Sequence, residues 1–148
     1  KTSWREVTAA DLERVRGAID DQTFRRGRHV VSEMARTTAC ADAMESGDWP
    51  QVGELMFASH ESLRDDFEVS TPELDKLVEL AAALGPEAGV IGARMTGGGF
   101  GGCTVTLVNA DALEQVQDAL VTGYVRDMGV EPTAFATRPA AGARVLAL

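Results

Sequence analysis

A run of glycines is the part of this sequence best suited to chemistry. Five of the six residues from 97 to 102 are glycine, and the run follows Arg94-Met95-Thr96 and precedes Cys103. Glycine reaches backbone conformations closed to other residues and lets a ligand approach the main chain, but it costs more conformational entropy on folding than any other residue. A turn between two strands needs only two residues. The run therefore indicates either backbone amides arranged around an anion or another loop, or a glycine-rich hairpin without a ligand, and local composition favours neither.

The glycine run lies between two predicted strands. After Pro86 the hydrophobic period changes, and residues 90–95 and 103–108 predict two strands that form a hairpin. A helix is expected from about residue 111 to 127, and a further strand over 133–137. A strand, helix, strand order implies a crossover, which is right-handed in nearly all proteins, so this helix should pack on one face of a mixed sheet. The second half therefore predicts an α+β layer domain.

Four helices are predicted in the first half from their start and stop signals. Thr8 is a candidate N-cap for the first helix, and Gly47 closes a long second helix. Asp48, with Gln51 three residues later, resembles a capping box at the start of a third helix. The fourth helix has the clearest boundaries, which are set by Thr71, Pro72, Gly85 and Pro86.

The composition describes a globular protein with an acidic balance. Of the 148 residues, 45% are hydrophobic and 25% are charged, which suits one domain with a sizeable core. The 14 Lys and Arg against 23 Asp and Glu give a net charge of −9, which disfavours nonspecific binding of nucleic acid or of an anionic membrane surface. No apolar run approaches the roughly 20 residues that span a bilayer. We therefore expect neither nucleic acid nor a membrane as a partner.

The cysteines and the first residue bear on location and completeness. Cys40 and Cys103 lie far apart and no secretory leader is evident, so we expect a reducing cytoplasm rather than a disulfide framework. Both cysteines are predicted to be small core residues. The chain opens with Lys1 rather than Met, so we expect it to be part of a larger protein.

Residues 92–103, Gly-Ala-Arg-Met-Thr-Gly-Gly-Gly-Phe-Gly-Gly-Cys, closely resemble the third conserved motif of galactokinases, within the GHMP small-molecule kinase superfamily. The resemblance covers nearly the whole chain, and supporting segments follow in family order at residues 4–8, 53–56, 59–63 and 70–75. It implies that residues 1–148 form the C-terminal domain of the family. The implied fold is α+β, with a ferredoxin-like mixed or antiparallel sheet packed with several helices. The N-terminal domain, which is catalytic and binds ATP, would lie upstream.

The same resemblance implies a chemistry. Galactokinases transfer the γ-phosphate of ATP to the C1 hydroxyl of α-D-galactose, with Mg²⁺ bound to the nucleotide, so the implied partners are galactose, ATP and the chain's own N-terminal domain. Phosphoryl transfer depends on positioning and on donors aimed at equatorial oxygens, which suits a glycine-rich loop. No catalytic residue and no metal ligand is expected in this chain. The residues implied to support the substrate and the phosphate loop are Met95, Thr96, Gly97, Gly98, Gly99, Phe100, Gly101 and Gly102.

Other residues have spacings or types that carry chemistry in other proteins. His29 and Glu33 stand four apart, like metal ligands on a helix, but zinc needs three or four ligands and no third is evident, so we expect a surface helix pair. His60 could serve as a nucleophile's base, yet without a partner acid a helix-packing or capping role is favoured. The arginines at positions 25, 26 and 28 are expected to form a solvated basic face, or else a surface for an acidic partner. The methionines at positions 34, 44 and 56 recur at helical spacing and are expected to fill the core.

Three alternative functions remain open. Another GHMP kinase, acting on a different sugar, mevalonate or homoserine, would share the fold and a glycine-rich third motif, although the wording of this motif favours galactokinase. A galactokinase-like sensor would bind ATP and galactose and engage a regulatory partner without turnover. A stand-alone module of ferredoxin-like type would bind a small ligand by itself. A Walker-type nucleotide site is disfavoured because no Gly-Lys-Ser or Gly-Lys-Thr follows the run.

Overall fold

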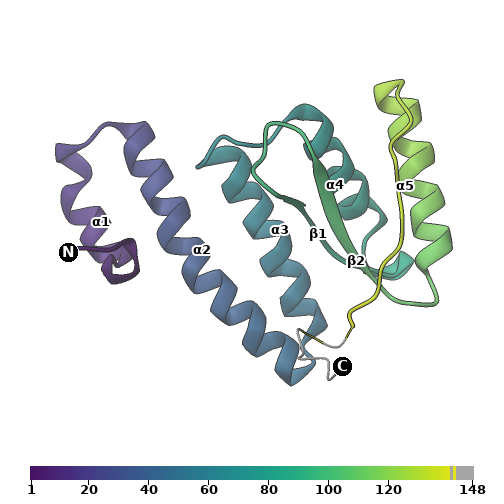
Figure 1. Cartoon of the computed structure of the whole chain (residues 1–148), viewed down its shortest axis with the longest axis horizontal. Coiled ribbons are helices and arrows are strands. Elements are labelled where there is room, and N and C mark those ends of the chain that lie inside the picture. The colour runs from purple at the N-terminus through teal and green to yellow at the C-terminus, as the bar shows by residue number, and fades with distance from the viewer. Residues whose placement is uncertain (141, 143–148) are drawn as a thin grey trace, which may run out of the picture.

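The computed structural model describes residues 1–140 and 142, and these residues form five α-helices and one β-hairpin. The helices lie side by side from α1 at one end to α5 at the other, and the hairpin crosses α4 between α3 and α5 (Figure 1). The elements are α1 Ala9–Val15, α2 Asp21–Ser46, α3 Trp49–Asp65, α4 Pro72–Leu84, β1 Val90–Thr96, β2 Cys103–Val108 and α5 Leu113–Met128.

The predicted helix boundaries are confirmed by hydrogen bonds at their caps. Thr8 Oγ1 accepts from the backbone N–H of Asp11 at 3.2 Å, and the Asp11 carboxylate accepts in return from the backbone of Thr8 at 2.9 Å, which completes a capping box. Asp48 accepts from the N–H of Gln51 at 3.1 Å, and Thr71 caps α4 in the same way. These contacts are local, so short stretches of sequence were enough to predict them.

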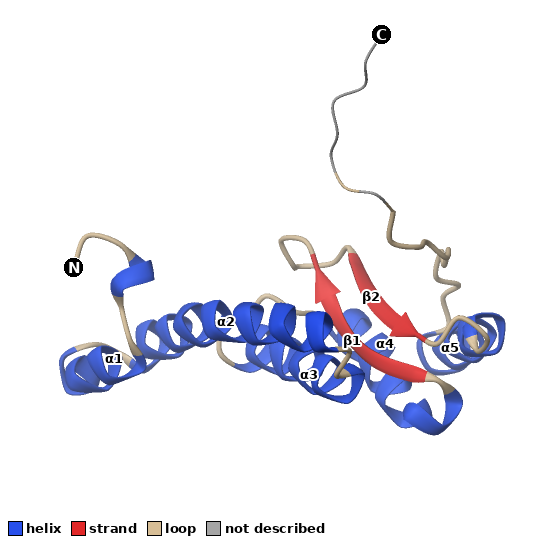
Figure 2. Cartoon of the chain, turned by 90° about the horizontal axis from the view of Figure 1, so that it is seen from below, coloured by secondary structure: helices blue, strands red, loops and turns tan. Residues whose placement is uncertain are grey.

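The hairpin forms a layer of its own on the helices. β1 pairs with β2 in antiparallel register, with Met95 opposite Thr104 and Thr96 opposite Cys103. Seen from below, the helices form one layer, the strands lie across it on one side, and the loop that joins the strands projects on that same side (Figure 2). The α+β class and the antiparallel sheet are therefore confirmed.

The prediction of a strand over residues 133–137 is wrong. The structure describes these residues without regular secondary structure, and every one of their side chains is exposed, including Phe135 at 81%. The segment carries residues typical of strands, but β-propensity expresses a fit to a half-buried pleated surface, and here no described strand pairs with it. The sheet of the described residues is consequently antiparallel rather than mixed, and the expected crossover is not formed.

Two apolar clusters hold the hairpin to the helices. The first joins α4, β1 and α5, and its members are Val78, Ala81, Val90, Ala93 and Val116. The second lies beneath the glycine loop, and its members are Leu63, Val69, Leu74 and Met95. A Val, Leu or Met side chain contributes about 1.5–3 kcal/mol to the stability of the fold when it is fully buried. The residues on which the loop rests are therefore well packed.

Helix α3 meets β1 through two glycines. A Cβ atom added at Gly53 would lie 1.9 Å from the carbonyl oxygen of Ile91, and one added at Gly92 would lie 2.8 Å from the Cα of Gly53. Real Cβ atoms do not approach backbone this closely, so any larger residue would push α3 off the strand. This close approach fixes the distance between the helix that carries His60 and the strand that leads into the loop.

None of the five residues expected in the core is fully buried. Met44 is 47% exposed because it borders a hollow between α2 and α3 that no described residue fills. Cys40 is partly buried at the same hollow, and Cys103 is exposed as the first residue of β2, next to the loop. Met34 and Met56 are partly buried. Among the described residues, no helix is long and apolar enough to cross a membrane.

Candidate functional site

The root of the glycine loop is fixed by a buried histidine. Met95, near the end of β1, is fully buried, and its backbone N–H donates to Nδ1 of His60 on α3 at 3.2 Å. A neutral imidazole accepts on one nitrogen and carries its proton on the other, so this bond puts the proton of His60 on Nε2. His60 thereby ties the last turns of α3 to the strand residue that precedes the loop.

Asp75 and Ser70 extend this contact towards α4. His60 Nε2 lies 3.2 Å from Asp75 Oδ1 without reaching hydrogen-bond geometry with any described residue, and the hydroxyl of Ser70 donates to the same Asp75 oxygen at 2.5 Å. His60 is only 2% exposed, and burial lowers its pKa below the ordinary 6.5 although Asp75 opposes the shift. His60 is therefore neutral near pH 7 and acts as a packing and hydrogen-bonding residue, as expected, but it does have the partner acid that the sequence did not reveal.

The tip of the loop is fixed by the turn between α3 and α4. The backbone N–H of Phe100 donates to the carbonyl of Val69 at 2.7 Å. A Cβ atom at Gly99 would lie 2.3 Å from that same carbonyl oxygen, and Gly99 has a φ of +81°. Only glycine fits there, because the backbone is left-handed and two main chains are in contact. The loop is thus docked at Gly99 and Phe100.

Phe100 holds its side chain away from the rest of the described chain. Its φ is +59°, which is uncommon for a bulky residue and costs of order 1–3 kcal/mol. Its side chain is 76% exposed, second only to Phe135 among the large hydrophobic residues that the structure describes. Phe100, whose backbone is strained, is therefore held by the Val69 contact in a position where its apolar side chain contacts little of the described chain.

The other four glycines of the loop meet nothing in the described part of the chain. A Cβ atom at any of them would have no heavy atom within 4 Å beyond its chain neighbours. Three have positive φ, so their glycine requirement comes from backbone conformation, whereas Gly98 does not. The open positions are Gly97, Gly98, Gly101 and Gly102. Their backbone is therefore open to an incoming ligand or to another protein surface.

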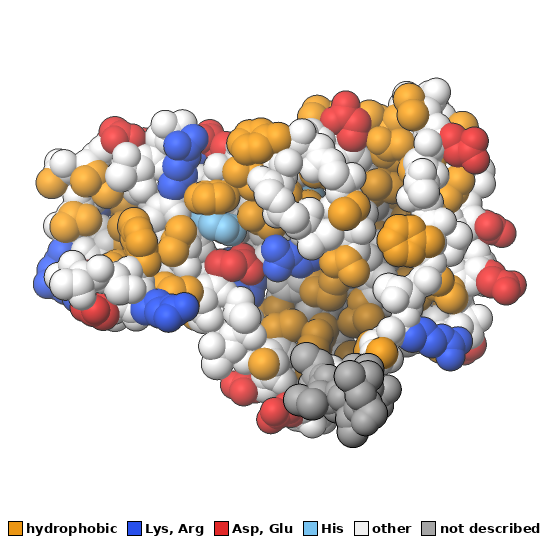
Figure 3. All heavy atoms as spheres, viewed as in Figure 1, with side chains coloured by type: hydrophobic (Ala, Val, Ile, Leu, Met, Phe, Trp, Pro, Cys, Tyr) orange, Lys and Arg blue, Asp and Glu red, His pale blue; other side chains and the backbone are white. Residues whose placement is uncertain are grey.

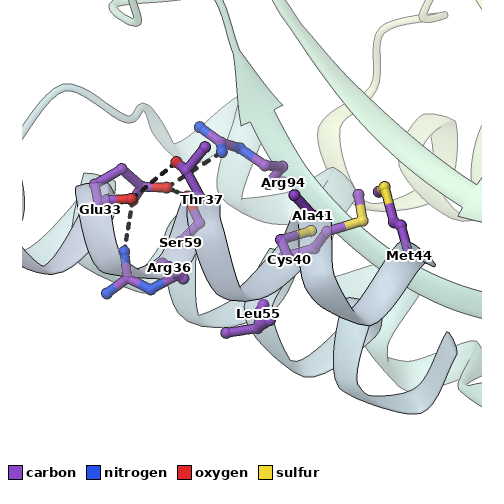
Figure 4. Close-up of a pocket in the computed structure, with 10 residues that line it drawn as sticks. Glu33, Arg36, Thr37, Cys40, Ala41, Met44, Leu55, Ser59 and Arg94 are labelled. Atoms are coloured by element: carbon purple, nitrogen blue, oxygen red, sulfur yellow. Dashed lines mark hydrogen bonds and ion pairs between the residues drawn. The ribbon is translucent and has the colours of Figure 1, made fainter. Parts of the chain in front are cut away.

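A cavity of about 280 Å³ lies beside the sheet, between α2 and α3. The space-filling view shows this face hollowed there, with hydrophobic side chains on the floor of the hollow (Figure 3). Glu33 stands at its polar end, where one carboxylate oxygen accepts from Ser59 at 2.7 Å and lies 3.4 Å from Nη1 of Arg94 (Figure 4). The other Glu33 oxygen pairs with Arg36 at 2.5 Å. Glu33 therefore connects α2, α3 and β1, and Arg94 reaches the hollow from two residues before Thr96.

The expected surface pair of His29 and Glu33 is not found. His29 is 6% exposed, its ring stacks on Phe67 with centroids 4.6 Å apart, and its Nδ1 lies 3.0 Å from Ser62 Oγ. Burial lowers the pKa of His29. Spacing along α2 did not reveal that α3 covers this side of the helix. Within the described residues, no three His, Cys, Asp or Glu side chains come together as a metal site.

The three arginines near the start of α2 form ion pairs with acidic residues of this same chain. Arg25 and Arg26 approach Glu68 at 2.9 Å and 3.8 Å, and Arg28 pairs with Asp66. The expected solvated basic face is thus largely neutralised by the turn that carries Val69. The sequence did not reveal that this turn contacts both the glycine loop and the arginines of α2, because Glu68 and Val69 carry no motif of their own.

Comparison with known proteins shows which family the chain belongs to. A family model described as "GHMP kinases C terminal" matches residues 40–126. Galactokinases from Homo sapiens and Bos taurus are each 49% identical to the chain, over 148 and 146 residues. These matches cover 100% and 99% of the chain but 36% of each relative, so the chain spans about a third of the length of the curated relatives that it matches.

Solved structures extend the comparison to three dimensions. A crystal structure of Lactococcus lactis galactokinase in complex with galactose matches with a TM-score of 0.81 and 39% identity, over 88% of this chain and 33% of that one. L. major mevalonate kinase in complex with R-mevalonate matches with a TM-score of 0.54 and 24% identity, over 86% of this chain and 35% of that one. The second likeness shows a shared fold alone.

Proposed function

Because the chain belongs to the GHMP kinase C-terminal family, we propose that it is the C-terminal domain of a galactokinase. The full protein would transfer the γ-phosphate of ATP to the C1 hydroxyl of α-D-galactose. Support comes from the wording of residues 92–103 and from the 49% identity with galactokinases of two mammals. The observation that carries the proposal is the loop itself, which is fixed at Met95 and Phe100 while the remaining glycines stay open.

The loop would assist phosphoryl transfer without acting as a nucleophile, a general acid or a general base. Charge in this reaction spreads over the equatorial oxygens of the transferred phosphoryl group, so preorganised donors and exclusion of water lower the barrier. The open backbone at Gly97 and Gly98 offers N–H groups without side chains to obstruct an approach. We propose that the loop borders the cleft between this domain and the N-terminal domain, and that it supports the phosphate loop there.

The catalytic side chains and the metal site are assigned to the rest of the protein. Mg²⁺ takes carboxylate and phosphate oxygens with near-octahedral geometry, and the described residues gather no acidic cluster that fits it. We propose that ATP and Mg²⁺ are bound mainly by the N-terminal domain. By this account the 148-residue chain shows no kinase activity alone, and the full enzyme works in the cytoplasm. Residues 141 and 143–148 of the domain assigned to residues 1–148 lie outside the described part.

The test is release of ADP by the full-length protein with Mg-ATP and a panel of acceptors. The panel comprises galactose, glucose, N-acetylgalactosamine, arabinose, mevalonate and homoserine, with the 148-residue chain as the control. We expect turnover with galactose by the full-length protein and none by the chain alone. The chain contributes only part of the proposed cleft, so ADP release by the chain alone would contradict the proposed division of labour.

Each other outcome names an alternative. Binding of ATP and galactose without turnover would identify a galactokinase-like sensor. Selective turnover of mevalonate, homoserine or a different sugar would place the protein elsewhere in the superfamily. The 39% identity to the Lactococcus lactis galactokinase, whose structure is in complex with galactose, supports galactose among these acceptors.

A further inference from the structure

The turn between α3 and α4 is an unusual platform for the glycine loop. It presents the Val69 carbonyl to the N–H of Phe100 at 2.7 Å, and its preceding residue, Glu68, has a φ of +61°. Glu68 and Phe100 are the two described residues other than glycine with positive φ, and they lie on the two sides of one contact. Such conformations persist only where the surroundings hold them, so something must hold Glu68.

Helix α2 supplies the restraint on Glu68 through its side chain. The Glu68 carboxylate accepts from Arg25 Nη2 at 2.9 Å and from Gln22 Nε2 at 3.1 Å, and Arg26 approaches it at 3.8 Å. These hydrogen bonds lower the pKa of Glu68, and the carboxylate in turn raises that of Arg25. Glu68, whose backbone is strained, is thus the residue of the turn whose side chain is bound by α2.

Arg25 also holds the start of the turn by its backbone. Its Nη1 donates to the carbonyl of Asp65 at 2.7 Å while its Nη2 donates to Glu68 and its Nε to Asp21 at 2.9 Å. A planar guanidinium can make these bonds together, whereas an ammonium cannot reproduce the fork. One side chain therefore spans the turn from Asp65 to Glu68.

A second, more buried network reinforces the same turn. Asp66 pairs with Arg28 and accepts from the hydroxyl of Ser62 at 3.1 Å, and Ser62 Oγ lies 3.0 Å from Nδ1 of His29. The ring of His29 stacks on Phe67. Every residue of the turn up to Glu68 is thus held by α2 or α3, and Val69 follows directly.

We propose that Arg25 and Glu68 are positioning residues for phosphoryl transfer: they hold the Val69 carbonyl where it docks Phe100 and so set the position of the glycine loop. Neither residue would contact the sugar or the nucleotide. The inference rests on the proposed function for its effect on turnover, but its effect on the loop is independent of any substrate. A displacement of about 1 Å at a reacting group lowers rates by about 100-fold, so a small shift of the platform has consequences.

The experiment compares Glu68→Gln and Arg25→Met with wild type in the full-length protein. Glu68→Gln removes the charge at constant size, and Arg25→Met removes the guanidinium while keeping an apolar stem. The first measurement is amide hydrogen exchange, by mass spectrometry, of peptides covering residues 97–102. The matched control is Arg126→Met, because Arg126 pairs with its neighbour Asp127 on α5 and takes no part in the turn.

We expect exchange of the Phe100 amide, read from these peptides, to rise about 10-fold in both variants and to stay at the wild-type level in the control. The kcat should fall about 10-fold with the KM for galactose unchanged, since loop position and not sugar binding is altered. Arg25→Lys should lie between wild type and Arg25→Met, because an ammonium can satisfy one of the bonds. A merely structural role would lower thermal stability without this order in kcat.

The outcomes separate the inference from the proposed function. Faster loop exchange in both variants, in a protein whose wild-type form phosphorylates no sugar, would support the platform and contradict the galactokinase proposal. Unchanged exchange in both variants would overturn the platform, whatever happens to turnover. A fall in kcat with unchanged exchange would likewise overturn it.

Discussion

The tip of the glycine loop and the rest of the loop differ in the reason why glycine is needed. At Gly99 the requirement lies within this chain, because an added Cβ would lie 2.3 Å from the Val69 carbonyl oxygen. At Gly98 an added Cβ meets no described atom within 4 Å, and the backbone is not left-handed. The described chain does not require glycine at position 98, and we propose that its requirement comes from outside, from a ligand or from another surface.

The largest effect on turnover is expected for Gly98→Val in the full-length protein. A valine there would project into the open space where we place the cleft, so activity should be abolished. The chain itself has room, so the melting temperature should stay within about 1 °C of wild type. Gly17→Val is a matched control, since Gly17 is equally open and also lacks positive φ. Wild-type turnover by Gly98→Val would refute an outside requirement.

Gly99→Ala should have the next largest effect and a different signature. The methyl group must displace Val69 or the loop, and a residue other than glycine in the left-handed region costs about 1–2 kcal/mol by itself. We expect kcat to fall about 100-fold together with a lower free energy of unfolding. Chemical denaturation and steady-state kinetics measure the two quantities. A fall in kcat with wild-type stability would remove the distinction between Gly99 and Gly98.

Phe100→Ala sharpens the comparison from the side of the exposed ring. The ring is 76% exposed, so its removal should change the free energy of unfolding by less than about 0.5 kcal/mol. If the ring packs on the N-terminal domain, turnover should fall about 10-fold, as for an interface aromatic worth about 1.4 kcal/mol. Unchanged kinetics would show that Phe100 has no partner in the full enzyme.

The smallest effect is a pH dependence of stability from the two buried histidines. Burial lowers the pKa of both His29 and His60 below 6.5, so protonation favours the unfolded chain. Their contribution to stability is therefore present above pH 6.5 and is lost as the pH falls through the lowered pKa of each. Melting temperatures between pH 8 and pH 5 should fall less steeply in His60→Gln than in wild type. Equal slopes would show that His60 does not titrate on unfolding.

What the sequence could predict was local. The caps Thr8, Asp48 and Thr71 bond to residues three positions on, and the hairpin and its loop follow from short patterns, so these were predicted correctly. The strand over residues 133–137 was not, because a strand needs a partner and propensity does not supply one.

The parts of the site that the sequence did not reveal depend on contacts between distant residues. His60 meets Met95 across 35 positions, and Arg25 meets Glu68 across 43. No spacing rule connects such pairs, and Val69 contributes only a carbonyl, which every residue has. The motif identified the loop, and only the fold showed which of its glycines are docked.

The most direct test of the account is a crystal structure of the full-length protein with galactose and a non-hydrolysable ATP analogue. We predict that Phe100 N still donates to Val69 O and that the backbone of Gly97 and Gly98 lies within hydrogen-bond distance of a phosphate oxygen or of the phosphate loop of the N-terminal domain. A loop that faces solvent, with no phosphate and no second domain within reach of these glycines, would contradict the account.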